Sequence, residues 1–222
     1  MDLFAQRFMD SERYNKIGDI ISSHLQHREE LQESVPVFVE TIHLLETCFR
    51  KGCKLYLAGN GGSLADCEHI AGELLKGFYS KRSILEPHRS KLGETLGSSL
   101  QSGLPVIPLT GFPALRSAVA NDLGPDLDFA QLIWALGNPG DVFWGFSTSG
   151  NSMNIINAIK AAKVKGLSTI GFTGSSGGQL NEMVDICLLA PSVKTHLIQE
   201  FHESAYHAIC LTLESLFFEP SA

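Results

Sequence analysis

Five short apolar runs, each followed by a turn and then by a helical pattern, constrain the fold of this chain more than any other feature. The runs are Lys54–Ala58, Val106–Thr110, Asp141–Phe146, Ser168–Thr173 and Asp185–Leu189. The helical patterns cover Leu64–Lys76, Pro113–Ala120, Leu127–Leu136, Ser152–Lys165, Gln179–Met183 and Thr195–Phe218. Apolar strands that alternate with helices are typical of a parallel sheet covered on both faces. The alternation therefore predicts a doubly wound α/β domain with a five-stranded parallel sheet.

The part of the chain before the first run has a helical pattern only. From Leu31 to Phe49 apolar residues recur at steps of three or four, and Ser34 and Pro36 suit the start of a helix. A second pattern of this kind, Tyr14–Leu25, predicts a partner helix. The two helices form a hairpin whose apolar face needs a cover, either the chain's own sheet or another subunit. We expect one domain over residues 1–222.

Composition argues against several classes of protein. Of the 222 residues 44% are hydrophobic and 18% charged, which are ordinary values for a globular protein. The net charge of −7, without any run of five like charges, argues against binding to nucleic acid but allows a pocket for a small anion. The N-terminus is polar and no 18 apolar residues follow one another, so we expect a soluble cytoplasmic protein that does not bind membranes. Five scattered cysteines without a Cys-x-x-Cys pair are expected to be reduced thiols: Cys48, Cys53, Cys67, Cys187 and Cys210.

Three polar turns follow predicted strands, where doubly wound sheets bind their ligands. They are "GNGGS" at Gly59–Ser63, "STSGNS" at Ser147–Ser152 and "TGSSGG" at Thr173–Gly178. The second turn carries four hydroxyls at the start of a helix, where free N–H groups and a partial positive charge suit a phosphate. It has no lysine, unlike the nucleotide-binding P-loop. Serine and asparagine are also ordinary helix caps, but four hydroxyls together favour a phosphate.

Two predicted helices carry imidazoles and carboxylates on one face. His69 and Glu73 are spaced i,i+4, and Gln199, Glu203 and His207 follow one another at steps of four. Such groups, brought together from two helices, could move protons on a sugar or hold a divalent metal. The alternative for these residues is an ordinary solvated helix face. For His207, whose sequence neighbours are apolar, the alternative is a histidine buried in the core.

Five segments carry a resemblance to a known family. The segments "GNGGSLADCEHIAGEL", "VANDLG", "GDVFWGFSTSGNSMNIINAIKAAKVKG", "TIGFTGSSGG" and "IQEFHESAYHAI" resemble, in order and spacing, the motifs of the phosphoheptose isomerases. These enzymes belong to the sugar isomerase (SIS) domain family. The match runs from about Leu31 to Glu214, apart from the stretch after Phe78. It implies a flavodoxin-like fold and an aldose–ketose isomerase that converts sedoheptulose 7-phosphate to D-glycero-D-manno-heptose 7-phosphate through an enediol.

The resemblance also implies a role for individual residues. Glu73 would be the base that takes a proton from carbon, and His207 would be the acid that moves protons at oxygen. The substrate-binding residues would be Asn60, Gly61, Gly62, Ser63, Asp122, Ser147, Thr148, Ser149, Ser152 and Gln199. In some members the positions of His69, Glu73, Gln199 and His207 hold zinc, one ion per subunit. The family further implies a homotetramer with sites at subunit interfaces, with residues 1–52 forming a helical bundle and residues 53–222 the α/β core.

Two departures from the family pattern concern the substrate. Where the bacterial heptose enzymes often have an arginine in "TGRY", this chain reads "LKGFYSKR", so Lys76, Lys81 or Arg82 are the candidate replacements. The stretch Tyr79–Gly103 contains an insertion at Leu85–Gly103, and we expect it to be functional or to form a short helix around Ser90–Gln101.

Two other functions are compatible with the same fold. One is a non-catalytic SIS protein that binds a protein partner, like the DnaA-binding initiator proteins, and the other is a phosphosugar sensor. Glu73 and His207 favour the enzyme, because an adaptor needs neither an acid nor a base in its cleft.

Overall fold

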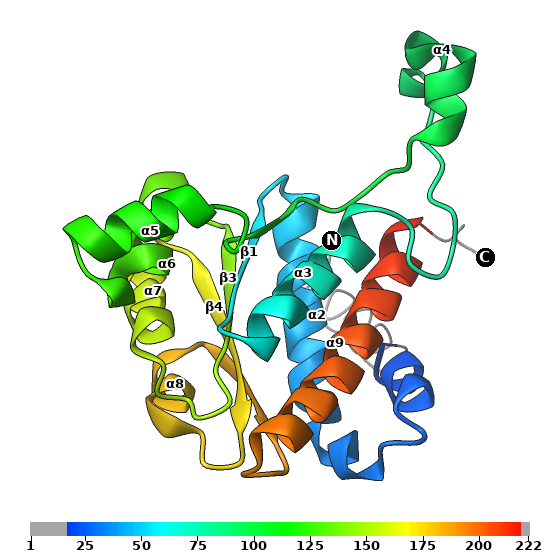
Figure 1. Cartoon of the computed structure of the whole chain (residues 1–222). Helices are drawn as coiled ribbons and strands as arrows, with labels where there is room; N and C mark the ends of the chain where they lie inside the picture. Colours follow the sequence, from blue (N-terminus) through cyan, green and yellow to red (C-terminus); the bar gives the residue numbers. More distant parts are fainter. Residues whose placement is uncertain (1–16, 219–222) are drawn as a thin grey trace, which may run out of the picture.

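The computed structural model describes residues 17–218, which form an α/β fold around one parallel sheet (Figure 1). The strand order is β2-β1-β3-β4-β5 and every neighbouring pair is parallel. This is the flavodoxin-like order, in which the direction of winding reverses between β1 and β3. The prediction of a doubly wound five-stranded sheet is therefore confirmed. The strands are β1 (Leu55–Ala58), β2 (Val106–Pro108), β3 (Val142–Phe146), β4 (Ser168–Gly174) and β5 (Ile186–Ala190).

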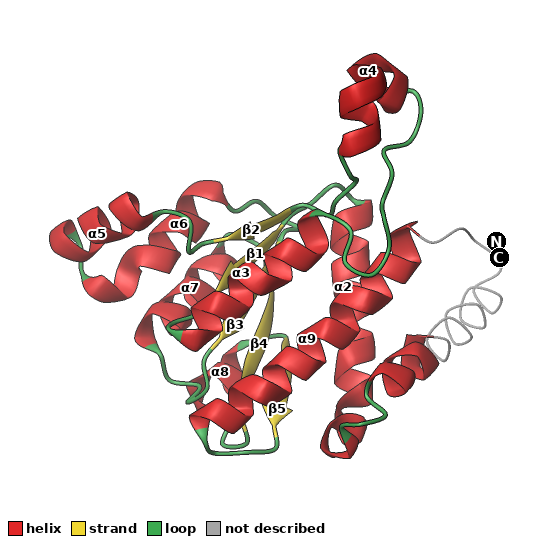
Figure 2. Ribbon diagram, turned by 45° about the vertical axis from the view of Figure 1, so that its right-hand side comes forward, coloured by secondary structure: helices red, strands yellow, loops and turns green. Residues whose placement is uncertain are grey.

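Helices cover both faces of the sheet (Figure 2). Alternate side chains of β1 show the division, because Leu55 and Leu57 pack with α2, α3 and α9, whereas Tyr56 packs with α6, α7 and α8. Strand β2 ends two residues before the predicted end at Thr110, because the chain turns there and Gly111 N–H donates to Pro108 O. The helices are η1 (Glu29–Ser34), α2 (Val35–Arg50), α3 (Gly62–Leu75), α4 (His88–Ser99), α5 (Pro113–Asp122), η2 (Pro125–Leu127), α6 (Asp128–Leu136), α7 (Met153–Val164), α8 (Gly178–Met183) and α9 (Thr195–Phe218).

The N-terminal hairpin packs on the chain's own core. Its first helix is described over residues 17–24, so the predicted start at Tyr14 lies outside the described residues. Ile17 and Ile21 of this helix are buried in the same cluster as Phe38 of α2 and strands β1 and β3. Leu31 lies in η1 rather than in α2, whose first turn contains Pro36. The chain's own sheet and helices therefore bury the main apolar face of the hairpin.

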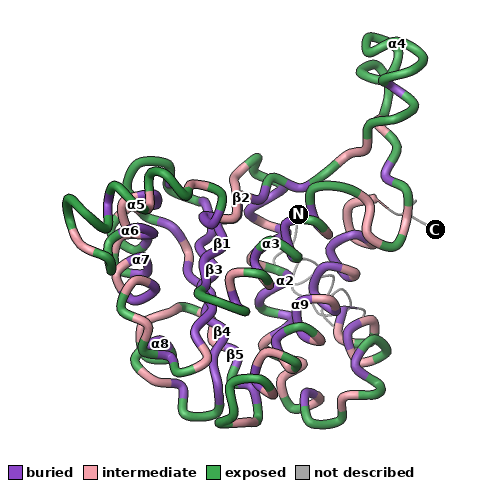
Figure 3. Tube along the Cα trace, in the orientation of Figure 1, coloured by how far each residue is buried: buried purple, intermediate pink, exposed green. Residues whose placement is uncertain are grey.

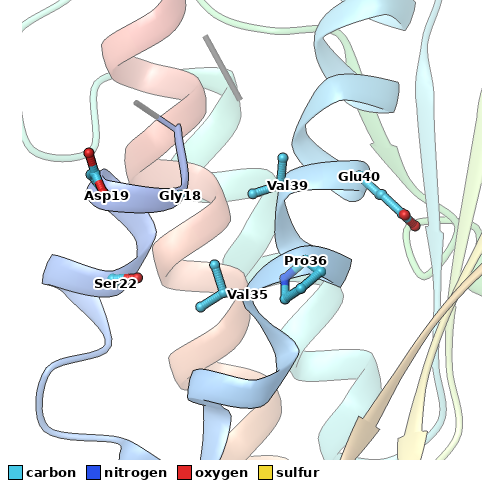
Figure 4. A pocket seen from close by; sticks show the side chains of 7 residues that line it. All are labelled: Gly18, Asp19, Ser22, Val35, Pro36, Val39 and Glu40. Atoms are coloured by element: carbon cyan, nitrogen blue, oxygen red, sulfur yellow. The ribbon is translucent and has the colours of Figure 1, made fainter. Parts of the chain in front are cut away.

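A groove remains between the two helices of this hairpin. It has a volume of about 440 Å³. Figure 4 shows Val35 and Val39 of α2 pointing toward the helix that carries Gly18 and Ser22. Glu40 and Asp19 give its rim an acidic character.

Within residues 17–218, no helix is both long and apolar enough to cross a membrane.

The stretch between α3 and β2 forms an arm that projects away from the rest of the molecule (Figure 1). Its helix, α4, starts at His88 rather than at Ser90 as predicted, and is interrupted at Gly93, where φ is 78°. Figure 3 shows that most of the arm is exposed, and Leu85 and Leu96 have 76% and 47% of their surface accessible. The expectation that this stretch contains a short helix is confirmed.

Candidate active site

The carboxyl ends of β1 and β3 open into a pocket of about 300 Å³. It is formed by the turns Gly59–Ser63 and Ser147–Ser152 together with the first turns of α9. Its polar groups are hydroxyls, amides and backbone groups, and none of the described residues that line it is charged. Hydrogen bonds and helix N-termini are thus what it offers to an anion. The lining residues are Asn60, Gly61, Gly62, Ser63, Phe146, Ser147, Thr148, Ser152, Thr195 and Gln199.

One wall of the pocket is the first turn of α3. Gly61 has a φ of 56°, in the left-handed region that favours glycine, so the chain can turn sharply from β1 into the helix. A side chain at Gly62 would collide with the amide of Gln199. Ser63 is buried, and its N–H donates to Asn60 O at 3.1 Å. Glycines in this turn therefore let α9 bring Gln199 against the N-terminus of α3.

The opposite wall carries hydroxyls from the turn between β3 and α7. The Ser147 and Ser152 oxygens lie 2.9 Å apart. Ser152 is the N-cap of α7, yet its side chain makes no capping hydrogen bond, so ordinary helix capping does not account for it. Ser149 is exposed and accepts a hydrogen bond from Asn151 N–H at 3.2 Å. Ser147, Thr148 and Ser152 line the pocket, whereas Ser149 does not.

The third polar turn supports the second instead of lining the pocket. A side chain at Gly150 would collide with the backbone of Gly177 and Gly178, so the two turns touch through their backbones. The N–H of Leu180 donates to Gly150 O at 2.9 Å and ties the turns together. The glycines of "TGSSGG" therefore fix the shape of the hydroxyl-rich turn.

A second group of polar residues lies where α3 contacts α9, beyond the turn that carries Gly62. His69 Nε2 is 3.1 Å from Glu73 Oε1 on the same helix and 3.4 Å from His207 Nε2 on α9. The other ring nitrogen of His69, Nδ1, is 2.9 Å from the Tyr206 hydroxyl. That hydroxyl is also 3.5 Å from Asp66 Oδ1. Helices α3 and α9 thus bring together an acid/base cluster, which we define as His69, Glu73, Glu203, Tyr206 and His207.

The surroundings of this cluster change how its members titrate. Burial and the nearby His69 lower the pKa of His207, so its imidazole is neutral near pH 7. Burial and the charge of Glu203 raise the pKa of Asp66 to about 6. Burial and the neighbouring Asp66 also raise the pKa of Tyr206, which therefore keeps its proton. The cluster contains neutral proton donors and acceptors beside carboxylates.

Three residues of the cluster have the chemistry of metal ligands. The ligand atoms of His69, Glu203 and His207 all lie within 4.8 Å of one another, and Glu73 adds a carboxylate beside His69. Gln199, expected both among the metal ligands and among the substrate-binding residues, lines the pocket at the ends of β1 and β3. The spacing of residues 199, 203 and 207 had predicted Glu203 on this helix face, although the family resemblance gave no role to Glu203 itself.

The other histidine of α9 in this region belongs to the core. His202 is buried, and its Nε2 lies 3.2 Å from Thr173 O. Burial lowers the pKa of His202 to about 4, so it stays neutral. His202 is therefore the buried core histidine of this helix, whereas His207 belongs to the acid/base cluster.

Residues 19–174 match the SIS domain family model. The chain belongs to this family. It is 39% identical over 203 residues to the phosphoheptose isomerase of Roseiflexus sp., covering 91% of this chain and 93% of that protein. It is 36% identical to the phosphoheptose isomerase of Aneurinibacillus thermoaerophilus, covering 91% and 96% of the two chains.

Two solved structures of SIS proteins resemble this chain closely. The phosphoheptose isomerase of Francisella tularensis aligns with a TM-score of 0.73 and 30% identity, covering 90% of this chain and 97% of that one. The enzyme of Neisseria gonorrhoeae aligns with a TM-score of 0.68 and 31% identity, covering 96% and 97%. The recognition of this SIS chain as similar to the phosphoheptose isomerases is confirmed.

Arg82 does not replace the family arginine as a contact to the ligand. Its side chain is buried and pairs with Glu214 at 2.7 Å. It also donates hydrogen bonds to Leu74 O at 2.8 Å and Glu73 O at 2.9 Å, and thereby closes the end of α3. Among the remaining candidates, Lys76 is exposed and donates to Gly77 O.

For two further residues, Asp122 and Thr195, the structure differs from the sequence prediction of which residues line the pocket. Asp122 is exposed at the end of α5, where its carboxylate accepts a hydrogen bond from Asn121, and it does not line the pocket. Thr195 lines the pocket but was not predicted to do so. Its signal in the sequence is a hydroxyl at the first position of a predicted helix, the same signal that singled out "STSGNS".

Proposed function

We propose that this SIS protein is a phosphosugar isomerase that converts sedoheptulose 7-phosphate to D-glycero-D-manno-heptose 7-phosphate. The observation that carries the proposal is the combination, on the same two helices α3 and α9, of an uncharged hydroxyl-rich pocket with a carboxylate–imidazole cluster. The relatives named phosphoheptose isomerase support the same substrate. The alternatives, a partner-binding adaptor and a phosphosugar sensor, are not favoured, because they leave the cluster without a purpose.

In this proposal the phosphate binds in the pocket and the sugar chain extends toward the cluster. Ser63, Ser147, Thr148 and Ser152 contact the phosphate oxygens, and the N-terminus of α3 offers backbone N–H groups. Gln199 and His207 are eight residues apart on α9, about 12 Å along the axis. An extended seven-carbon sugar together with its phosphate, with C–C bonds of about 1.5 Å, spans a large part of this distance.

Glu73 and His207 divide the proton transfers between carbon and oxygen. Glu73 takes a proton from C1 of the ketose and returns it to C2 of the enediol. His207 gives a proton to the carbonyl oxygen at C2 and recovers one from the hydroxyl at C1. A neutral imidazole both donates and accepts hydrogen bonds, which suits His207 with its lowered pKa. No net proton is gained or lost.

The cofactor in this proposal is one Zn²⁺ per subunit. Two imidazole nitrogens and a carboxylate oxygen form a donor set that fits zinc, and His69, Glu73 and His207 would hold it. Bound there, zinc would polarise the oxygens of the substrate. Glu73 and His207 cannot hold the ion and transfer protons through the same atoms at once, so zinc bound there would compete with their acid/base roles.

We also propose a homotetramer with sites at subunit interfaces, formed by a single domain whose N-terminal helices take part in a bundle. The accessible groove on these helices, with Val35 and Pro36 on its wall, supports such a contact (Figure 4). The exposed leucines of the arm form a second apolar surface that another subunit could cover. Size-exclusion chromatography combined with light scattering tests the tetramer.

The cytoplasmic location of the protein stays a prediction.

A panel of ketose phosphates tests the isomerase directly. The full chain is incubated in D₂O with sedoheptulose 7-phosphate, fructose 6-phosphate or ribulose 5-phosphate, with and without Zn²⁺, and followed by NMR. We expect conversion of the seven-carbon sugar, with deuterium at C2 of the aldose as the mark of an enediol. A folded protein that converts no member of the panel would overturn the proposal.

A further inference from the structure

We propose that Asn154 is a positioning residue for substrate binding, which fixes the side-chain atoms that Asn60 presents to the sugar. The proposal rests on the proposed function, because it concerns how the same pocket binds a sugar phosphate. Asn154 lies on α7, two residues after Ser152, and does not itself line the pocket. Its effect on the ligand therefore has to pass through Asn60, which does line the pocket.

The side-chain amides of Asn60 and Asn154 are joined by two hydrogen bonds. Asn60 Nδ2 donates to Asn154 Oδ1 at 2.9 Å, and Asn154 Nδ2 donates to Asn60 Oδ1 at 3.0 Å. The two residues are 94 positions apart in the sequence, one in the turn after β1 and the other in the first turn of α7. The pair therefore connects the turn that leads into α3 with the helix that follows the hydroxyl-rich turn.

A third hydrogen bond fixes the orientation of both amides. The backbone N–H of Ile155 donates to Asn154 Oδ1 at 3.0 Å. A donor needs an acceptor opposite it, so Asn154 must present its oxygen at this point and not its nitrogen. Rotating the Asn60 amide by 180° would then place its oxygen against that oxygen and its nitrogen against Asn154 Nδ2. Only one orientation of Asn60 satisfies the network.

The core holds the residue that fixes this orientation. Ile155 is fully buried in the cluster that contains Phe143 and Leu180. A side chain at Gly145 of β3 would collide with Ile155, so Ile155 lies directly on the sheet. The orientation of Asn60 thus depends on the packing of α7 against β3, and it is set before a ligand binds. Such preorganisation reduces the entropy that binding costs.

The pair also limits what Asn60 can offer to a ligand. A side-chain amide has two N–H donors and an oxygen with two acceptor positions. Asn154 uses one of each, which leaves Asn60 with one donor and one acceptor position. A sugar hydroxyl both donates and accepts hydrogen bonds, whereas the oxygens of a phosphate dianion only accept them. Asn154 therefore suits Asn60 to the sugar part of the substrate and not to its phosphate.

Titration calorimetry on a Glu73→Gln background tests the proposal, with sedoheptulose 7-phosphate and inorganic phosphate as the two ligands. We expect Asn154→Ala to raise Kd for the sugar phosphate roughly 3- to 10-fold, the effect of one neutral hydrogen bond. Kd for inorganic phosphate should stay within about 2-fold of the wild-type value, because the serine and threonine hydroxyls are unchanged. Asn157→Ala, which removes a hydrogen bond to Asp126 O from the same helix, is the matched control.

The variant Asn60→Ala provides the second comparison. If Asn154 acts through Asn60, replacing Asn154 should have no further effect once Asn60 is alanine. The double variant should then bind the sugar phosphate as weakly as Asn60→Ala alone, since residues that act as one unit are not additive. Asn154 is only half-buried, so we expect these variants to fold, and thermal unfolding checks that they do.

Three outcomes would overturn the proposal. They are wild-type affinity for the sugar phosphate in Asn154→Ala, an equal loss of affinity for both ligands, and additive losses in the double variant. Turnover of the wild-type chain in D₂O separates this proposal from the isomerase function. A chain that converts the sugar but binds it normally as Asn154→Ala refutes only the positioning role. A chain that shows the expected binding pattern but no conversion refutes only the isomerase.

Discussion

Two regions on helices α3 and α9, the pocket end at Gly62 and Gln199 and the cluster end at His69 and His207, are built from different chemistry. The pocket end consists of turns, hydroxyls and helix N-termini, without a charged side chain among the described residues that line it. The cluster end consists of titratable side chains held by the packing of two helices. Under the proposed function, the pocket binds the phosphate and the cluster acts on the sugar, so substitutions at each end should change different kinetic constants.

The largest effect is expected at the cluster end, from Glu73→Gln. The amide keeps the shape of the side chain but cannot take a proton from carbon, so kcat should fall about 10²–10⁴-fold. KM for the sugar phosphate should change little, because the pocket is intact. Steady-state kinetics measure both constants, with Glu68→Gln on the exposed side of α3 as control. A variant that keeps more than about a tenth of the wild-type kcat would contradict the role of Glu73.

Arg82→Met tests how the cluster end is supported. The change removes the ion-pair partner of the buried Glu214 and leaves it only the N–H groups of residues 78–80, so the unfolding free energy should fall by up to about 3–5 kcal/mol. It also frees Glu73 O at the end of α3, so kcat should fall more than KM rises. Urea unfolding measures the stability, and Lys81→Met is the exposed control. A loss equal to that of the control would show that Arg82 does not support α3.

At the pocket end, Ser152→Ala should weaken binding and leave kcat nearly unchanged. A hydrogen bond to a charged group contributes about 1.5–3 kcal/mol, so Kd for the sugar phosphate should rise roughly 10- to 100-fold. Ser149→Ala is the matched variant, and we expect a smaller effect because its hydroxyl faces Asn151. Titration calorimetry with the substrate on a Glu73→Gln background measures both. Equal losses in the two serine variants would contradict the orientation of this turn.

The smallest effect is expected from Tyr206→Phe. It removes one hydrogen bond to His69, which contributes about 0.5–1.5 kcal/mol, so kcat should fall roughly 2- to 10-fold. The pH profile of kcat should also shift, because His69 loses the partner of its Nδ1. Tyr56→Phe is the control, since it removes a hydroxyl bonded to Leu136 O on the other face of the sheet. An unchanged profile in Tyr206→Phe would rule out a positioning role.

The fold could be predicted from the sequence because its signals are local. The apolar run at 142–146 needs no distant partner to be recognised as a buried strand, and Thr195–Phe218 was predicted at both ends. The ends of helices and strands differ from the predicted ends where contacts with distant parts of the chain determine them. The end of α3 at Leu75, one residue before the predicted Lys76, coincides with the hydrogen bonds from Arg82.

The site was harder to predict, because side chains meet there across large separations in sequence. His69 and Tyr206 contact each other only because α3 packs on α9, and nothing near Tyr206 in the sequence indicates that contact. Arg82 looked like a free cation, but the fold buries it against Glu214. Ser149 does not line the pocket, and its hydroxyl accepts a hydrogen bond from Asn151 N–H instead, which the sequence of the turn did not indicate.

The arm has a consequence for how this protein can change over evolution. Its two ends are clasped at the base, where Ser83 pairs with Gln101 and Ser102 N–H donates to Arg82 O at 2.7 Å. Gln101 also accepts a hydrogen bond from Gly77 N–H at 3.0 Å. With the base closed in this way, residues can be added or removed beyond it without strain reaching α3. The arm is therefore a module whose length could be changed by an engineer while the pocket and the cluster stay the same.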